Sequence, residues 1–86
     1  MAIAEFALDG TLNRANDNYL ALLGYSQKDV PGRHHRSFCQ PSFVESEEYP
    51  ALWQHLRAGI AHSDKIERLR QDGTSCWLEA TGRIVH

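Results

Sequence analysis

Residues 70–85, RQDGTSCWLEATGRIV, are the clearest indication of the fold class of this chain of 86 residues. Asp72-Gly73 is a hairpin signal, because glycine tolerates the positive φ that a two-residue turn requires. After the turn, side chains alternate between two faces as in a half-buried strand. One face holds Cys76, Leu78, Ala80, Gly82 and Ile84, and the other holds Trp77, Glu79, Thr81 and Arg83. The pattern predicts strands over 64–70 and 75–85, with small inner residues that leave room for a helix or a ligand.

A helix is predicted immediately before this hairpin. Ser46 and the acidic pair Glu47-Glu48 suit a helix N-terminus, where the dipole favours negative charge. Pro50 must lie in the first turn, which places the helix over about 49–58. Its buried stripe has three- and four-residue spacing and consists of Tyr49, Leu52, Trp53 and Leu56. Gly59 is expected to end the helix.

A second hairpin signal, Asp9-Gly10, lies near the start of the chain and predicts strands over 3–8 and 11–15. Asn16 or Asp17 is expected to cap a short helix over 19–23, which Gly24 ends. Residues 26–29 read as a capping box, and 34–38 as one further turn. Two hairpins separated by helices predict an α+β fold: one antiparallel sheet with the longer helix and several short helices on one face.

Composition limits the function classes. The apolar share of 42% and charged share of 23% are those of an ordinary globular domain, and the length suits one domain. A net charge of −2 argues against nucleic-acid binding, and no apolar run approaches the ~20 residues that span a bilayer. Cys39 and Cys76 form no disulfide or zinc pattern, which favours reduced thiols and a cytoplasmic location.

Several strings, in order and spacing, resemble the PAS family of sensor domains. They are IAEFALDGTLNRAN (3–16), YLALLGYS (19–26) followed by DVPG (29–32), and RQDGTSCWLEA (70–80). A second set is similar to the PAS domains of bacterial methyl-accepting chemotaxis transducers of the aerotaxis type. That set is GRHHRSF (32–38), Pro41, SEEY (46–49), Trp53 and LRAG (56–59).

The resemblance implies a five-stranded sheet, of which this chain supplies four strands. We therefore expect a single PAS domain over 1–86, truncated at its C-terminal edge and lacking the fifth strand. The edge of the first strand is then expected to be unpaired. An open edge invites pairing with another chain, so a homodimer, strand exchange or a flanking signalling domain is expected as partner.

The resemblance also raises the question of a cofactor. Gly32-Arg-His-His-Arg36 is similar to a segment of flavin photoreceptors, but His35 stands at the position of their adduct-forming cysteine, so that photochemistry is excluded. Flavin (FAD) held without a covalent bond, with Arg33 or Arg36 on a phosphate, is one alternative. Haem on His55 is another, although His55 lies off the apolar stripe and is expected to face water. The expectation is that this fragment holds no cofactor. The candidate pocket residues are Arg33, Arg36, Phe38, Trp53, Leu56, Leu78 and Ala80.

No metal site or catalytic site is predicted. His34 and His35 are adjacent, so their side chains diverge by ~100° on a helical turn, and they are interpreted as surface or capping histidines. His35 and Cys39 could form a thiol site only with activating groups that the sequence lacks.

The functional expectation is a sensory module of a chemotaxis-type transducer, which binds a small ligand or reports redox state and dimerises. The alternative parent is a sensor histidine kinase or a cyclic-dinucleotide enzyme. Trp77, on the outer face of the sheet, is either an interface contact or an ordinary half-exposed aromatic residue.

Overall fold

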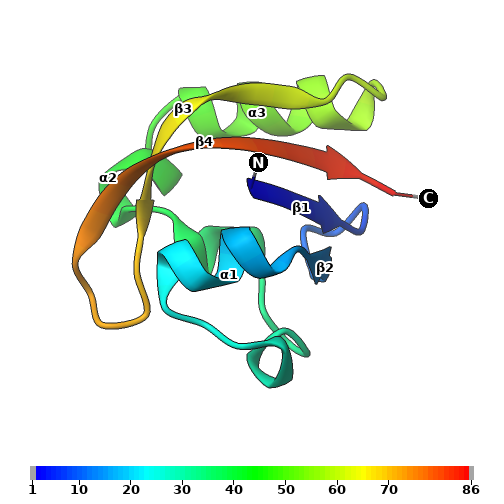
Figure 1. The fold of residues 1–86 in the computed structure, drawn as a ribbon. Helices are drawn as coiled ribbons and strands as arrows, with labels where there is room; N and C mark the ends of the chain where they lie inside the picture. Colours follow the sequence, from blue (N-terminus) through cyan, green and yellow to red (C-terminus); the bar gives the residue numbers. More distant parts are fainter. Residues whose placement is uncertain (1, 86) are drawn as a thin grey trace.

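The structure, a computed structural model, describes residues 2–85 (Figure 1). Two hairpins, at the start and at the end of the chain, enclose a series of short helices and one longer helix. In chain order the elements are β1 (Ala2–Phe6), β2 (Leu12–Ala15), α1 (Asp17–Leu23), the 3₁₀ turns η1 (Gln27–Asp29) and η2 (His35–Phe38), α2 (Pro41–Val44), α3 (Glu48–Arg57), β3 (His62–Leu69) and β4 (Ser75–Ile84).

The strands form one mixed sheet in the order β2-β1-β4-β3. Both hairpins are antiparallel, but β1 and β4 are parallel, from the pair Ala2/Ala80 to the pair Phe6/Ile84. Figure 1 shows β4 curving across the molecule between β3 and β1. Both α1 and α3 contact β4. The predicted α+β class, with helices on one face of the sheet, is confirmed.

Two expectations are wrong: that the edge of the first strand is unpaired, and that the sheet is wholly antiparallel. β4 has ten residues, and its second half pairs with β3 on one side and with β1 on the other. This pairing satisfies backbone groups of β1 that an open edge would leave to water. On the outer face, Arg83 Nε donates to Glu5 Oε2 at 2.7 Å, and Arg14 Nε lies 3.5 Å from Glu5 Oε1. These contacts join β2, β1 and β4 in register.

Local sequence signals determine the connections. Asn16 caps α1, since its Oδ1 accepts from the backbone N–H of Tyr19 at 3.0 Å. Gly24 ends α1 with φ +81°, and Ser26 and Asp29 form the predicted capping box. The long helix begins one residue earlier than predicted and also ends one residue earlier. The short helix α2, with Pro41 in its first turn, was not predicted.

The core lies between the sheet and the helices. Its largest fully buried side chains are Phe6, Leu23 and Phe38. The alternation predicted for β4 is confirmed, because Leu78 and Ala80 are buried.

The two Asp-Gly turns offer a matched pair of substitutions. Gly10 and Gly73 have φ of +92° and +91°. A Cβ on Gly10 would collide with the imidazole of His34, whose Nε2 bonds the Asp9 carbonyl at 2.7 Å, whereas nothing lies within 4 Å of a Cβ on Gly73. We expect Gly73→Ala to lower the free energy of unfolding by about 1 kcal/mol through backbone strain, and Gly10→Ala by about 2–3 kcal/mol. Chemical denaturation measures both; equal losses would show that His34 moves aside freely.

Candidate functional site

An open groove of about 700 Å³ lies between α2 and α3 on one side and the edge strand β3 on the other. Its apolar wall includes Phe43, Leu52 and Ile66, all half-buried. Arg68 and Trp77 also line it. The volume is within the range of about 300–1,000 Å³ that is typical of small-molecule sites. The groove is therefore large enough for a metabolite-sized ligand.

The space between helices and sheet, by contrast, is filled. The cavity there measures about 20 Å³, which is room for about one water molecule. Leu56 and Ala80 border this cavity. The predicted pocket residues on this side lie together as packed core, and they are Phe38, Trp53, Leu56, Leu78 and Ala80.

The ring of His35 occupies the centre of this core and is 4% exposed. It meets Phe6 and Trp53 edge-on at centroid distances of 4.9 and 5.2 Å, and its Nδ1 lies 3.2 Å from the Tyr49 hydroxyl. Burial, assisted by the charge of Arg68, lowers the pKa of His35 to about 3, so the ring is neutral at physiological pH.

The interpretation of both histidines as surface or capping residues is wrong for His35. It holds for His34, whose Nδ1 accepts from the backbone N–H of Arg36 at 3.2 Å. The physical reason is that His35 and Phe38 are three residues apart in η2, so the same turn directs both into the core. This three-residue spacing is visible in the sequence and could have predicted the burial of His35.

Cys39 lies 3.5 Å, from Sγ to Nδ1, from His35, but this contact does not make a nucleophile. Burial raises the pKa of the Cys39 thiol and keeps the neighbouring imidazole uncharged. An activated thiolate needs the opposite environment, with a positive partner and partial exposure.

Arg68 is the unusual group of the site. It stands opposite Cys76 on the inner face of β3 and is 5% exposed. Its Nη1 donates to the Glu67 carbonyl at 2.9 Å, and its guanidinium carbon lies 5.7 Å from the centre of the Phe43 ring. Its buried Nε has no hydrogen-bond partner within residues 2–85. Arg68 was not predicted as a site residue because strand 64–70 is mainly polar in sequence. The register that places Ile66 and Arg68 opposite Leu78 and Cys76 could have indicated that Arg68 faces inward.

The two arginines that were candidates for binding a flavin phosphate lie away from the groove and from the inner cavity. The guanidinium of Arg33 stacks 4.9 Å from the centre of the Tyr25 ring, and its Nε donates to the Asp29 carbonyl at 3.2 Å. Arg36 is exposed and contacts His34. Neither arginine borders the groove or the inner cavity.

The cofactor candidates can be tested against this geometry. A flavin does not fit between helices and sheet, because the rings of His35 and Trp53 fill that space and about 20 Å³ remains. His55 is exposed, as predicted, and lies at the wall of the groove. Within residues 2–85, no three His, Cys, Asp or Glu side chains come together as metal ligands.

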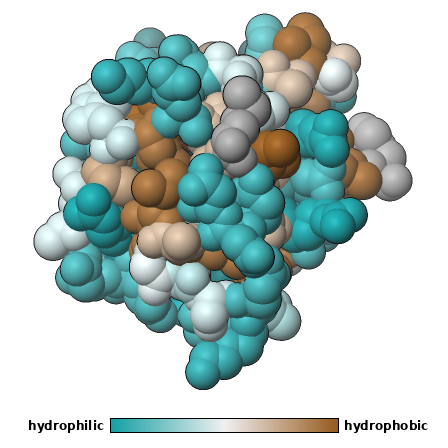
Figure 2. Space-filling model, in the orientation of Figure 1, coloured by the Kyte–Doolittle hydropathy of each residue, from teal (hydrophilic) through white to brown (hydrophobic). Residues whose placement is uncertain are grey.

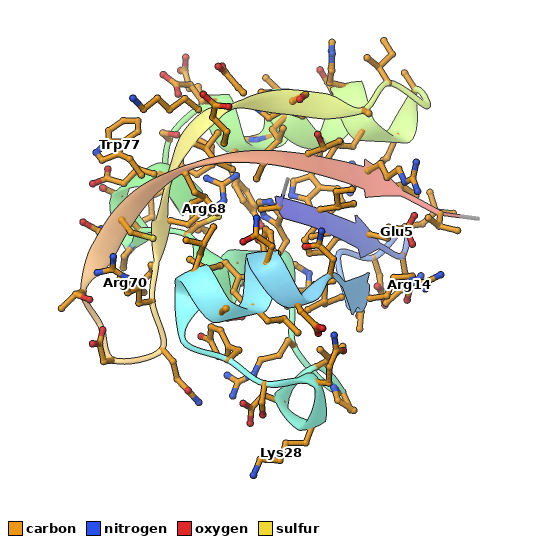
Figure 3. The ribbon with its side chains drawn as sticks, in the orientation of Figure 1. Glu5, Arg14, Lys28, Arg68, Arg70 and Trp77 are labelled. Carbon is orange, nitrogen blue, oxygen red and sulfur yellow. The ribbon has the colours of Figure 1, made fainter. Side chains whose placement is uncertain are left out.

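Trp77 projects outward from β4 and is 64% exposed, opposite Glu67 of β3 (Figure 3). The predicted outward orientation is confirmed. In Figure 2 the visible face is mostly hydrophilic, with apolar side chains reaching the surface in small areas. Over the part of the chain that is described, no helix has the length and apolarity needed to cross a membrane.

Comparison with known proteins agrees with this architecture. The family described as the PAS fold matches residues 13–86. The biofilm dispersion protein BdlA of Pseudomonas aeruginosa is 41% identical over 81 residues, which cover 94% of this chain but 19% of that protein. The chain thus spans about a fifth of the length of this relative.

Solved structures give the same result. The dark structure of the blue-light photoreceptor Aureochrome1 LOV has a TM-score of 0.58 and 28% identity, covering 77% of this chain and 47% of that one. A blue-light activated histidine kinase of Erythrobacter litoralis has a TM-score of 0.57 and 26% identity, covering 80% of this chain and 21% of the kinase. The family match covers most of the chain, and the sheet with its helical cover is of the same kind. The chain belongs to the PAS family, as its sequence strings predict.

Proposed function

We propose that this PAS domain is the sensory module of a chemotaxis-type transducer and that it binds a small ligand in the groove between α2–α3 and β3. The observation that carries the proposal is the contrast between a groove of about 700 Å³ and an interior cavity of about 20 Å³. The likeness to the biofilm dispersion protein of P. aeruginosa supports a signalling role. The alternative parent is a sensor histidine kinase, which the likeness to the E. litoralis kinase supports, or a cyclic-dinucleotide enzyme.

The proposed mechanism follows from the two walls of the groove. A ligand that touches both α3 and β3 changes the spacing between them, and it favours whichever spacing it binds more tightly. β3 is paired with β4 along its whole length, from His62/Gly82 to Leu69/Ser75. A displacement of β3 therefore moves β4, which passes it to a flanking domain or a second subunit. The module acts by binding and not by catalysis, and we propose a cytoplasmic location.

Filling the groove tests this function. Ala51 is an exposed residue of α3 that lines the groove, whereas Gln54 is exposed on the same helix and does not line it. We expect Ala51→Trp to reduce the signalling output of the full-length protein at least about tenfold, because the indole occupies the ligand site. Gln54→Trp is the matched control and should signal normally, with both variants folded by circular dichroism. Normal output from Ala51→Trp would exclude the groove as the sensing site.

A visible spectrum tests the flavin alternative, which the light-sensing neighbours support. We expect natively purified protein to be colourless, with no absorbance beyond the aromatic band, because the core has no space for the ring system. Native mass spectrometry should likewise find no flavin or haem. A bound flavin would mean that the core opens around His35 and would overturn the assignment of the groove.

Trp77 is the proposed contact to a second subunit or a flanking helix, since exposed aromatic residues are frequent interface anchors. We expect Trp77→Glu to weaken self-association at least about tenfold while the fold persists. Lys65→Glu is the control, because Lys65 on the neighbouring strand β3 is also exposed and the substitution also introduces an acidic side chain. Sedimentation equilibrium measures both, and an unchanged association constant for Trp77→Glu would remove the interface role.

A further inference from the structure

We infer that Arg68 is the anion anchor of the groove and that the ligand is a small monocarboxylate with an apolar body. The inference rests on the proposed function, since it names the ligand class of the same groove. It is carried by an unpartnered guanidinium nitrogen in a buried position, next to a groove with an apolar wall.

The charge of Arg68 is uncompensated. Arginine stays protonated in proteins, so the group remains a cation although it is 5% exposed. In residues 2–85, no Asp or Glu oxygen lies within 4.0 Å of its guanidinium; the ion pairs of this part of the chain join Glu5 to Arg14 and Arg83. A buried charge is costly unless a partner and hydrogen bonds satisfy it.

Three buried polar side chains that interact with Arg68 supply no negative charge. They are the hydroxyl of Tyr19, which hydrogen-bonds to the side chain of Arg68, and the imidazole of His35 and the thiol of Cys39, which feel its charge. Burial raises the pKa of Tyr19 and of Cys39, so both stay protonated at neutral pH, and His35 is neutral. The compensating anion must therefore come from outside this cluster.

The groove connects Arg68 to solvent. Arg68 borders both the groove and the inner cavity, so this residue lies between the two spaces. Figure 3 shows Arg68 among the side chains between the sheet and the helices. The planar fork of a guanidinium, with Nε as one of its donors, matches the two oxygens of a carboxylate. Phe43, Leu52 and Ile66 provide an apolar wall beside it for the rest of the ligand.

The rim of the groove restricts the charge of the ligand. Glu48, Asp64 and Glu67 line the groove, with Lys65 as the one lysine among its residues. These carboxylates disfavour a multiply charged anion such as a phosphate ester, because like charges repel at close range. A single carboxylate that reaches inward to Arg68 avoids most of this repulsion.

The test compares three probes on the purified chain by calorimetry: hexanoate, hexanol and inorganic phosphate. We expect saturable binding of hexanoate, at least about tenfold weaker binding of hexanol, and no measurable binding of phosphate, since only the first joins a carboxylate to an apolar body. This comparison needs no variant. Hexanol that binds as tightly as hexanoate, or phosphate that binds more tightly, would overturn the inference.

Variants then locate the anion. Arg68→Met keeps side-chain length and apolar packing, and we expect it to lose hexanoate binding at least about tenfold, while the exposed control Arg70→Met binds as wild type does. Arg68→Lys should fall between them, because lysine cannot form the bidentate contact. Full binding by Arg68→Met, with Ala51→Trp unable to bind, would refute the role of Arg68 and leave the groove intact. Binding by both variants would place the carboxylate elsewhere and would count against the proposed function as well.

Discussion

Replacing Phe38 by alanine is expected to lower the free energy of unfolding by about 3–5 kcal/mol, the usual cost of emptying a buried aromatic site. The side chain is fully buried and packs edge-on against Tyr19 and Tyr25, at centroid distances of 5.9 and 5.3 Å. Domains of this kind have only about 5–15 kcal/mol of stability in total, so the variant should be partly unfolded at 37 °C. Urea denaturation followed by tryptophan fluorescence measures the loss.

Phe43→Ala is the matched control for this substitution. Phe43 is half-buried in the wall of the groove, so its removal empties little closed space, and we expect a loss of about 1 kcal/mol. If the two variants are equally stable, the division between a closed core and an open groove is incorrect.

Lowering the pH from about 6.5 to 5 is expected to destabilise the domain by about 2 kcal/mol through His35 alone. The unfolded chain takes up a proton on His35 near pH 6.5, whereas the folded chain does so only near pH 3. The unfolded state therefore binds more protons between these values, and stability is complete above pH 6.5 and lost as the pH falls. The slope is about 1.4 kcal/mol per pH unit. Chemical denaturation at a series of pH values measures it.

The effect of His35 on stability falls in a higher pH range than the effect of the carboxylates. Hydrogen bonds lower the pKa of Asp9, Asp29 and Asp72 below 3.8. Protonation of these carboxylates therefore reduces the stability of the fold only below about pH 4 to 5. His35→Phe keeps a ring between Phe6 and Trp53 and should flatten the slope between pH 6.5 and 5. A His35→Phe variant with the slope of the wild type would assign the effect to other groups.

The local part of the fold could be predicted because single residues determine it. Asp9-Gly10 and Asp72-Gly73 mark both hairpins, and Asn16 and Gly24 mark the ends of α1. Each signal acts through hydrogen bonds or a positive φ within a few residues. These features need no knowledge of the rest of the chain.

The remaining features depend on contacts between distant segments. The parallel pairing of β1 with β4 joins residues almost 80 positions apart, and no local pattern encodes it. The burial of Arg68 and His35 arises because β3 and η2 meet beneath the helices, where charged or polar residues are not expected. The groove combines residues from α2, α3, β3 and β4, so sequence reasoning placed the candidate pocket in the core instead.

Side chains fill the interior of this domain. His35 and Trp53 occupy the space between sheet and helices with their rings, and the remaining volume lies outside, along β3. A sensory ligand is then expected at the surface of α3 and not in the core.

Nitrogen-15 NMR of the labelled chain during titration with hexanoate locates the bound ligand. We expect the chemical-shift changes to concentrate in Pro41–Val44, Glu48–Arg57 and His62–Leu69, while the amides of Phe6, Phe38 and Leu78 stay unchanged. The largest changes at Phe6, Phe38 and Leu78, with little change along β3, would place the ligand in the core and contradict this expectation.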